Sequence, residues 1–246
     1  MTDVGLGEDW EKLMQDLDEI VPYYEEGNSV MSFGTDVGLR RELLQKGMPE
    51  AGVFLDVGSG PGNMSAIARE VRPEAEGVLL DPLPRMLKRA AEERGETSFS
   101  FVCGVFEWLP FREGGFAACT AGFTIRDARD RTKAYQDIAF ALKPGGVFLL
   151  IDLAKPDSRV KRAMVTTYWR AIAPVLLRMR LGSRWRYFAD IYLTYRHLPP
   201  NKVFLEQLGQ VFATVEGEKR MLDGVLMVKA AKAAAAPDET ALRPSS

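Results

Sequence analysis

An acidic residue stands just before a glycine-rich turn in the stretch VFLDVGSGPGNMSAIARE, residues 53–70. The apolar run that leads into the turn is typical of a buried strand, and the apolar residues after it recur at helical spacing. At such a strand–turn–helix junction Gly58, Gly60 and Gly62 would let the backbone approach a ligand closely. A nucleotide-type ligand is the first expectation for a turn of this kind.

The residues around the turn favour a cationic ligand over a pyrophosphate. The dinucleotide spacing G-x-G-x-x-G is not met, because Asn63 occupies the third position when Gly58 is the first. Asp56 would repel an anion, and Pro61 lacks an N–H that a phosphate could use. S-adenosylmethionine carries a sulfonium and an ammonium, which a buried carboxylate would compensate. Asp81, which ends the run GVLLD, suits ribose hydroxyls, although NAD would use the same device and both acids could be ordinary turn residues.

Alternating strands and helices must position these residues. Expected strands cover residues 53–57, 77–81, 99–104, 116–125 and 147–156, and expected helices cover 63–71, 84–95 and a segment from 130 that ends on the Pro-Gly-Gly turn 144–146. This alternation predicts an α/β fold with an open, doubly wound, mostly parallel sheet of the Rossmann-like kind. Ligands of such sheets bind outside the carboxyl ends of the strands.

Four segments are expected to flank this cofactor-binding core of residues 49–156. They are an N-terminal helical cap over 1–48 with a break at YYEEGNSVMSFG (23–34), a helical lid over 157–200, a return to the core over 201–231 as a helix and an antiparallel edge hairpin, and a disordered tail over 232–246.

Composition limits the classes of function. A chain of 246 residues suits one large domain with appendages, and a net charge of −2 gives no general attraction to nucleic acid, so no such partner is expected. Cys103 and Cys119 lie in apolar runs, which favours reduced thiols in a core over a disulfide. The single histidine, His197, gives little support for a metal site or a covalent nucleophile. The acidic start lacks a signal peptide and no run would span a bilayer, which predicts a cytoplasmic protein.

Several motifs in chain order resemble one family. LDVGSGPG, LLDP, LPF, FTIRDARDRTKAYQDIAFALKPGG and LIDLAKP are similar to the successive landmarks of class I S-adenosylmethionine-dependent methyltransferases. A closer resemblance is to the C-methyltransferases of ubiquinone and menaquinone biosynthesis, because residues 123–127 match their F-G-I-R-N pattern and residues 24–34 match their cap pattern Y-D-x-M-N-D-x-M-S-x-G. The resemblance extends over about residues 23–228.

The resemblance implies a cofactor, an acceptor and a set of binding residues. The cofactor would be S-adenosyl-L-methionine, with S-adenosylhomocysteine as product, and the acceptor a lipophilic small molecule, first of all a demethylated isoprenoid quinol. The predicted cofactor-binding residues are Asp56, Gly58, Ser59, Gly60, Gly62, Asn63, Asp81, Pro82, Val105, Phe106, Glu107 and Gly122.

The sequence departs from the family at three places. Gly104, Val105 and Phe106 stand where Gly-Asp-Ala is usual, so backbone at Phe106 or the side chain of Glu107 would have to recognise adenine. Asp127 replaces an asparagine, and Leu39 replaces a tryptophan. The last two changes concern the acceptor side.

Methyl transfer from a sulfonium is a direct displacement, which needs alignment and exclusion of water rather than a covalent nucleophile. The resemblance assigns Arg126 a catalytic part. Its guanidinium is too basic to abstract a proton, so we expect it to stabilise a phenolate or orient a water, with Asp127 holding its geometry. Tyr24 and Asn28 would close over the acceptor from the cap. The alternative is that Arg126 and Asp127 only form ion pairs at the start of the next helix.

The stretch 155–188 contains nine Lys or Arg residues against one Asp, with Tyr and Trp interleaved. Through residues 157–188 such a lid could contact an anionic membrane surface transiently, which would make the protein peripheral at the inner face of the membrane. It could equally pack on the core or on a second subunit, as in a homodimer. Open alternatives for the whole chain are an O- or N-methyltransferase of another lipophilic small molecule or a phospholipid amine, a non-catalytic S-adenosylmethionine-binding protein, and an NAD-binding reductase.

Overall fold

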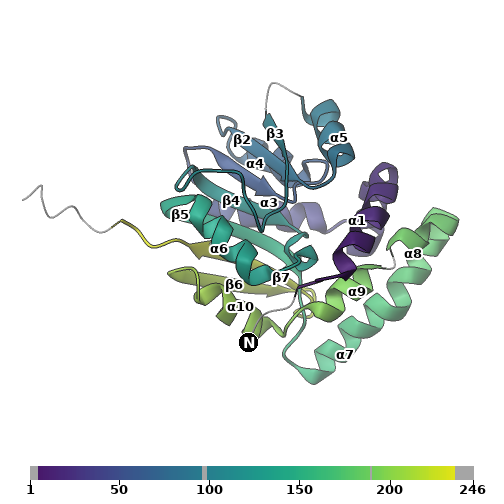
Figure 1. Cartoon of the computed structure of the whole chain (residues 1–246). Helices are drawn as coiled ribbons and strands as arrows, with labels where there is room; N and C mark the ends of the chain where they lie inside the picture. Colours follow the sequence, from purple (N-terminus) through teal and green to yellow (C-terminus); the bar gives the residue numbers. More distant parts are fainter. Residues whose placement is uncertain (1–4, 96–98, 189, 236–246) are drawn as a thin grey trace, which may run out of the picture.

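A single twisted sheet of seven strands forms the centre of the molecule in this computed structural model, which describes residues 5–95, 99–188 and 190–235 (Figure 1). The strand order is β3-β2-β1-β4-β5-β7-β6. The strands are β1 (Phe54–Val57), β2 (Gly77–Asp81), β3 (Phe99–Cys103), β4 (Phe116–Gly122), β5 (Leu142–Leu153), β6 (Thr214–Arg220) and β7 (Val225–Ala231). The first five pair in parallel, and the β6–β7 hairpin joins β5 antiparallel. The predicted α/β class and mostly parallel sheet are confirmed.

Helices cover both faces of the sheet. On one face lie α3 (Asp36–Gly47), α4 (Asn63–Val71) and α5 (Pro84–Arg94), and on the other lie α6 (Arg131–Ala141) and α10 (Asn201–Gly209). Both faces of the central strands are therefore buried, which explains why these strands read as continuous apolar runs in the sequence.

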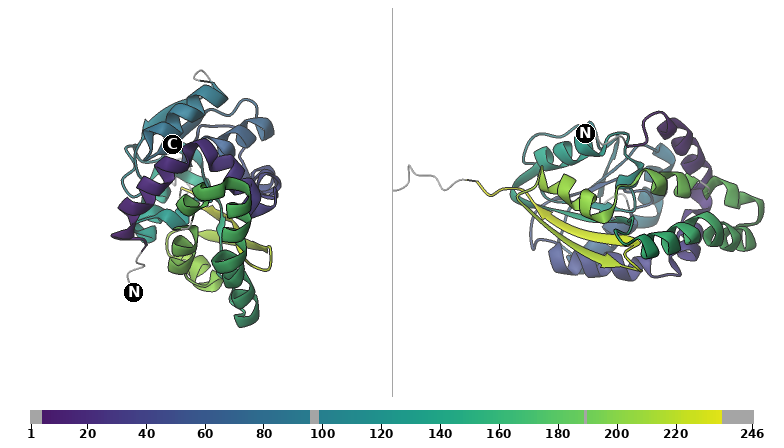
Figure 2. Two further views of the ribbon diagram at one scale, coloured as in Figure 1. Left: turned by 90° about the vertical axis from the view of Figure 1, so that its right-hand side faces the viewer. Right: turned by 90° about the horizontal axis from the view of Figure 1, so that it is seen from below.

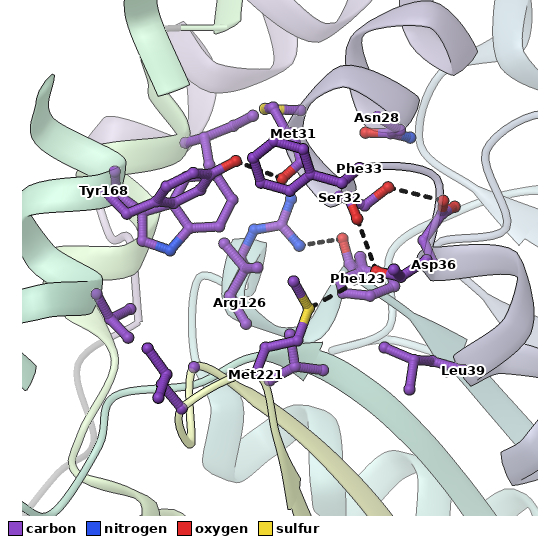
Figure 3. Close-up of a pocket in the computed structure, with 18 of the residues that line it drawn as sticks. Asn28, Met31, Ser32, Phe33, Asp36, Leu39, Phe123, Arg126, Tyr168 and Met221 are labelled. Atoms are coloured by element: carbon purple, nitrogen blue, oxygen red, sulfur yellow. Dashed lines mark hydrogen bonds between the residues drawn. The ribbon is translucent and has the colours of Figure 1, made fainter. Parts of the chain in front are cut away.

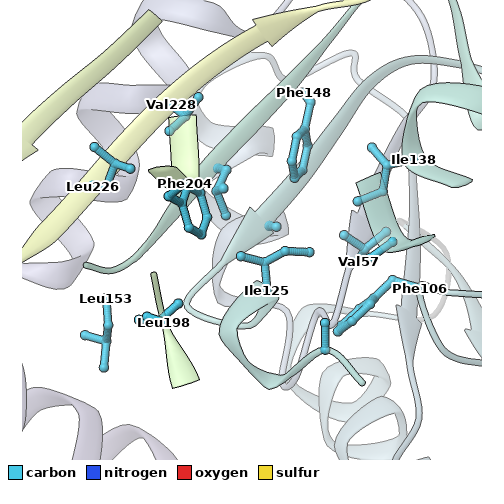
Figure 4. Close-up of a cluster of buried hydrophobic side chains, with 14 of the residues drawn as sticks. Val57, Phe106, Ile125, Ile138, Phe148, Leu153, Leu198, Phe204, Leu226 and Val228 are labelled. Atoms are coloured by element: carbon cyan, nitrogen blue, oxygen red, sulfur yellow. The ribbon is translucent and has the colours of Figure 1, made fainter. Parts of the chain in front are cut away.

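The core on the α6 and α10 side is closely packed around the central strands (Figure 4). Ile138 of α6, Phe148 of β5 and Phe204 of α10 all belong to this cluster and are buried. The rings of Phe148 and Phe212 stack with their centroids 5.7 Å apart. Burial of each such side chain contributes roughly 1.5–3 kcal/mol, so this layer holds the carboxyl ends of the strands in fixed positions.

A separate helical layer lies beyond the carboxyl ends of the parallel strands (Figure 2). It consists of α1 (Asp9–Ile20), the 3-10 turn η1 (Val21–Tyr23), α2 (Tyr24–Ser32), α7 (Arg159–Thr167), the π-helical turn η3 (Tyr168–Ile172), α8 (Ala173–Leu181), the 3-10 segment η4 (Gly182–Phe188) and α9 (Asp190–His197). Helices α1 and α2 of the predicted cap form this layer together with the predicted lid, since α2 packs on α8 and α1 packs on η4, whereas α3 of the cap lies on the sheet. Lys12 of α1 also pairs with Asp190 of α9 at 2.7 Å.

Two local predictions were wrong. The expected break at residues 23–34 is mostly helical, because α2 continues to Ser32 and ends only where Phe33 takes a left-handed φ of 51°. Gly27 lies inside α2 and makes room for the ring of Phe188, so it serves packing rather than helix termination. The expected Pro-Gly-Gly turn is part of β5, which begins at Leu142 and pairs with β4 through a register shift.

Two further predictions hold only in part. Cys119 and Cys103 are both free, but only Cys119 is buried. Of the predicted disordered tail, Lys232 and Ala233 hydrogen-bond to the backbone of Gly146 and Gly145, at 2.9 and 3.1 Å respectively. Residues 236–246 lie outside the described residues.

Candidate functional site

Two cavities open where the helical layer meets the carboxyl ends of the strands. The first, here called the glycine-loop cavity, is bounded by the turn after β1, by the ends of β2 and β3, and by α1 above them. The second, called the apolar cavity, has a volume of about 330 Å³ and lies between α2, α3, α7 and the β6–β7 turn. Phe123 and Arg126 line both cavities, so these two residues form the shared wall.

Most of the predicted site residues meet in the glycine-loop cavity. Seven of the predicted cofactor-binding residues line it, namely Gly58, Gly60, Asp81, Pro82, Val105, Phe106 and Glu107. Tyr24, Arg126 and Asp127 of the predicted catalytic set line it as well, whereas Asn28 lines the apolar cavity. Five predicted residues line neither cavity: Asp56, Ser59, Gly62, Asn63 and Gly122.

Gly58 and Gly60 shape the floor of the glycine-loop cavity. Their φ angles are 61° and 53°, in the left-handed region that side chains rarely adopt. A Cβ atom at Gly58 would also overlap with the hydroxyl of Thr124. The turn therefore brings the exit of β1 against the segment that follows β4, and it leaves bare backbone facing the cavity.

Asp56 is a buried carboxylate beneath this turn rather than a lining residue. Ser65 Oγ donates to its Oδ2 at 2.6 Å, and Thr120 Oγ1 donates to its Oδ1 at 2.9 Å. Desolvation raises the pKa of Asp56 to about 6. Because Asp56 is buried and lines neither cavity, it can act on a cationic ligand through its field and through the geometry of the turn, not by direct contact.

Asp81 reaches the cavity and fixes the turn at the same time. Its Oδ2 accepts from the N–H of Gly60 at 2.8 Å, and its Oδ1 accepts from the N–H of Leu83 at 2.9 Å. Desolvation raises the pKa of Asp81 to about 6. A carboxylate has about four acceptor positions, so each oxygen keeps one lone pair for the ribose hydroxyls of a nucleoside.

Glu107 offers an acceptor where the sequence lacks the usual acid. Its Oε1 accepts from the N–H of Arg129 at 2.6 Å, and burial raises the pKa of the carboxyl. Among the described residues, no hydrogen-bond partner reaches its buried Oε2. An amine such as that of adenine would satisfy this oxygen. The bare turn, Asp81 and Glu107 therefore fit the backbone approach, ribose and adenine that S-adenosylmethionine requires.

Arg126, in the 3-10 turn η2 (Ile125–Asp127), is held rigidly in the shared wall (Figure 3). Its Nη1 donates to Asp152 Oδ1 at 2.9 Å, and its backbone N–H donates to Asp152 Oδ2 at 3.0 Å. Its Nε donates to Thr194 Oγ1 at 3.2 Å. Burial alone would lower the pKa of Arg126, but the carboxylates of Asp127 and Asp152 outweigh it and raise the pKa. The guanidinium is a fixed cation.

Asp127 differs from its predicted role. Asp152 fixes the geometry of Arg126, whereas Asp127 only approaches Arg126 Nε at 3.5 Å. Within the described part of the chain its Oδ1 has no hydrogen-bond partner. Desolvation raises the pKa of Asp127 to about 7, against the opposing charge of Arg126. At the start of the next helix Asp130 caps α6 through the N–H of Lys133, and the shorter ion pair of Arg126 is the one with Asp152.

The apolar cavity is lined mainly by aliphatic and aromatic side chains. These are Met31, Phe33, Leu39, Leu153, Met164, Val165, Tyr168, Trp169, Ile191, Met221, Leu222 and Val225. Tyr168 Oη donates to the carbonyl oxygen of Met31 at 2.6 Å and so ties the lid to α2 (Figure 3). Polar groups gather near the shared wall, where Asn28, Asp36 and Arg40 join Arg126. The cavity suits an apolar molecule with one polar end.

Sequence reasoning missed several of these residues. Trp10, Met14 and Leu17 of α1 cover the glycine-loop cavity, although the sequence indicated only a helical cap in this part of the chain. Asp152 lies in the run VFLLIDLAKP, where an acid inside an otherwise apolar strand could have indicated a buried partner for a cation. Among the described residues, no group of three or more His, Cys, Asp or Glu side chains could hold a metal ion. No described helix has the length and apolarity to cross a bilayer.

The role of Glu107 predicts a specific change in ligand preference. Glu107→Gln keeps a carbonyl oxygen for the N–H of Arg129 but can replace the unpartnered Oε2 with an amide donor. The parent should bind S-adenosylhomocysteine about tenfold more tightly than its inosine analogue, which lacks the adenine amine, and Glu107→Gln should abolish that preference. Isothermal titration of both ligands measures this. The exposed Glu113→Gln is the matched control, and an unchanged preference in Glu107→Gln contradicts the assignment.

The chain is similar to known proteins of one family. It matches the ubiE/COQ5 methyltransferase family over residues 8–222. It is 30% identical over 185 residues to the demethylmenaquinone methyltransferase of Thermus thermophilus. The aligned stretch covers 74% of this chain and 80% of that one. It is 31% identical over 164 residues to the ubiquinone/menaquinone biosynthesis C-methyltransferase UbiE of Desulfotalea psychrophila, covering 66% of each chain.

A solved structure supports the same fold. The phosphoethanolamine N-methyltransferase 2 of Haemonchus contortus, in complex with S-adenosyl-L-methionine, superposes with a TM-score of 0.59 over 80% of this chain and 52% of that one, at 16% sequence identity. At that identity the likeness concerns the fold alone. Together with the family match over most of the chain, it confirms the resemblance noted in the sequence. The protein belongs to the ubiE/COQ5 methyltransferase family and is an S-adenosylmethionine-dependent methyltransferase.

Proposed function

We propose that this enzyme transfers a methyl group to a ring carbon of a reduced, demethylated isoprenoid quinol. The observation that carries the proposal is that the apolar cavity shares its wall, Phe123 and Arg126, with the glycine-loop cavity. An acceptor ring at that wall would lie next to the cofactor while an apolar tail continued along the cavity. The names of the relatives from Thermus thermophilus and Desulfotalea psychrophila point to the same acceptor class.

Arg126 and Asp127 divide the catalytic work in this proposal. S-adenosylmethionine, when bound, supplies the methyl group, and the bonding electron pair stays on its sulfur. The acceptor hydroxyl gives its proton to Asp127, whose Oδ1 lacks a partner among the described residues and whose pKa of about 7 suits a base near neutral pH. Arg126 stabilises the phenolate that results. The activated ring carbon takes the methyl group, and its own proton then leaves to solvent, which restores the aromatic ring. Asp127 returns its proton to the ring oxygen, which regenerates the base.

Tyr24 and Asn28 serve the two sides of the wall. Tyr24 lies above Gly60, with its Oη 3.8 Å from the position a Cβ atom would take there, so it closes the glycine-loop cavity. Burial raises the pKa of its phenol, so the hydroxyl stays protonated and can donate. Asn28, one helical turn further along α2, faces the apolar cavity. We infer that Tyr24 excludes water from the methyl donor and that Asn28 orients the acceptor.

The acceptor assignment predicts a dependence on redox state. Only the hydroquinol carries a hydroxyl proton whose loss activates the ring carbon, so reduced demethylmenaquinol should be methylated and the quinone should not. Turnover with labelled S-adenosylmethionine under anaerobic conditions, followed by mass spectrometry, measures the product and places the methyl on carbon or oxygen. Methylation of a phospholipid amine, or of the hydroxyl oxygen, with no carbon product contradicts the proposal, and binding without any turnover favours a non-catalytic protein.

The proton-accepting role of Asp127 predicts a pH dependence. The single-turnover rate of the parent should rise with pH along a limb centred near 7, because only the ionised carboxylate accepts a proton. In Asp127→Asn the limb should vanish and the rate should fall about 10²- to 10⁴-fold. Rapid-quench measurements across pH 5.5–9 would resolve this. Asp157→Asn, outside both cavities, is the control, and an unchanged limb in Asp127→Asn refutes the role.

The lid also presents a surface suited to an anionic membrane at the inner face. Val160 and Met164 of α7, Ile172 of η3, and Val175 and Met179 of α8 are exposed, with Met179 80% and Val160 73% accessible. Within each half they recur every three or four residues, with arginines between them. We infer that this stripe, defined by these five residues, docks transiently on lipid and brings the mouth of the apolar cavity to the bilayer.

Docking of the stripe predicts vesicle binding that depends on apolar side chains. Ile172→Asp with Met179→Asp should reduce co-sedimentation with phosphatidylglycerol vesicles severalfold, because charged side chains cannot enter the headgroup boundary. Val203→Asp, on the exposed side of α10, is the matched control. If the parent does not bind vesicles but sediments as a dimer that the double variant dissociates, the stripe is a subunit interface and the membrane proposal fails.

A further inference from the structure

Arg40 of α3 is a buried cation whose donors are poorly used. It is 3% exposed, and its Nη1 donates to the carbonyl oxygen of Gly122 at a long 3.4 Å. Within the described part of the chain its Nε has no hydrogen-bond partner. The carboxylate of Asp36 lies 3.8 Å from that Nε and already accepts from Ser32 Oγ at 2.8 Å. Burying a charge with so few partners is costly unless an anion completes the site.

The guanidinium lies at the junction of the two cavities. Gly122 ends β4 beside β1, and a Cβ atom there would overlap with Arg40 Nη1, so the missing side chain gives the guanidinium its place. Arg40 also lies over the ring of Phe123, 4.9 Å from its centroid, on the wall that both cavities share. Arg40 itself lines the apolar cavity and contacts the shared wall at Phe123, beside the end of β4.

The electrostatics connect Arg40 to the cofactor side. Its charge lowers the pKa values of both Asp56 and Tyr24 against the larger effect of burial. Asp56 lies beneath the glycine turn, and Tyr24 lies above Gly60, so Arg40 is within electrostatic reach of the floor and the roof of that turn. The apolar cavity, proposed for the acceptor, already has a fixed cation in Arg126, so an acceptor does not require the charge of Arg40.

We propose that Arg40 binds the carboxylate of the methionyl group of S-adenosylmethionine. That end of the cofactor is a zwitterion. The negative field of Asp56 suits its ammonium. The unpartnered Nε and the weakly bonded Nη1 of Arg40 suit its carboxylate, so the two residues together favour an amino acid end over a phosphate or a neutral chain. The assignment does not depend on the identity of the methyl acceptor.

Binding measurements on the free protein test this assignment. The ligands are S-adenosylhomocysteine, its decarboxylated analogue and 5′-methylthioadenosine, which lacks the whole amino acid end. The parent should bind the decarboxylated analogue about 10- to 100-fold more weakly than S-adenosylhomocysteine. Arg40→Met should lower the affinity for S-adenosylhomocysteine by a similar factor. Its affinity for 5′-methylthioadenosine should stay unchanged, which also shows that the variant is folded. The affinity of Arg40→Lys for S-adenosylhomocysteine should lie between those of the parent and Arg40→Met. Arg41 pairs with Glu70 on the surface, so Arg41→Met should bind all three ligands like the parent.

Three results would overturn the assignment. The first is equal affinity of the parent for S-adenosylhomocysteine and its decarboxylated analogue, a result that can be obtained without any variant. The second is an Arg40→Met variant that loses affinity for all three ligands to the same extent, which would make Arg40 a packing residue. The third is unchanged S-adenosylhomocysteine binding with a raised KM for the acceptor, which would assign Arg40 to the apolar cavity.

Discussion

The site depends on one buried ion pair, between Arg126 after β4 and Asp152 near the end of β5. It joins adjacent strands at their carboxyl ends, with Nη1 and Oδ1 2.9 Å apart, and Thr194 extends it to α9 of the lid. Removing either partner would leave an uncompensated charge in the interior, which is far more costly than the pair itself is stabilising. The pair therefore fixes the wall between the cavities and leaves the guanidinium permanently charged, which limits its chemistry to electrostatic stabilisation.

Around this fixed cation, four carboxyls, those of Asp56, Asp81, Glu107 and Asp127, have raised pKa values because they are desolvated. The pKa is about 6 for Asp56 and Asp81 and about 7 for Asp127. An acid whose pKa is higher in the folded than in the unfolded state stabilises the fold as the pH falls through the folded value, and costs stability above it. Near neutral pH the glycine-loop cavity thus stores unfavourable negative charge. A positively charged sulfonium ligand would reduce the repulsion among these carboxylates. It would therefore gain affinity from the field of the whole cavity and not from one contact alone.

Most of the fold and about half of the site could be read from the sequence. The parallel strands are buried on both faces and can be recognised in the sequence as apolar runs. Gly58, Gly60 and Asp81 could be predicted as site residues because they lie at the carboxyl ends of two of these strands. The residues that were missed act across long stretches of chain. Arg40 meets Gly122 over 82 positions and Arg126 meets Asp152 over 26, and no local pattern encodes either pairing. The helix break expected over residues 23–34 was wrong for the same reason. Gly27 lies inside α2 because the ring of Phe188, far along the chain, packs against it.

The N-terminal helix has a further consequence for how the glycine-loop cavity is covered. Helix α1 is one side of the glycine-loop cavity through Trp10, Met14 and Leu17, and it buries Leu13 and Ile20 against the rest of the protein. Lys12 pairs with Asp190, and Arg129 stacks 3.6 Å from the ring centroid of Trp10. Such exposed contacts contribute little, so the attachment of α1 depends mainly on its buried Leu13 and Ile20. The cover of the glycine-loop cavity is therefore held by other contacts than the wall that Arg126 and Asp152 fix, so substitutions at the exposed positions of α1 can change the cover without disturbing that wall.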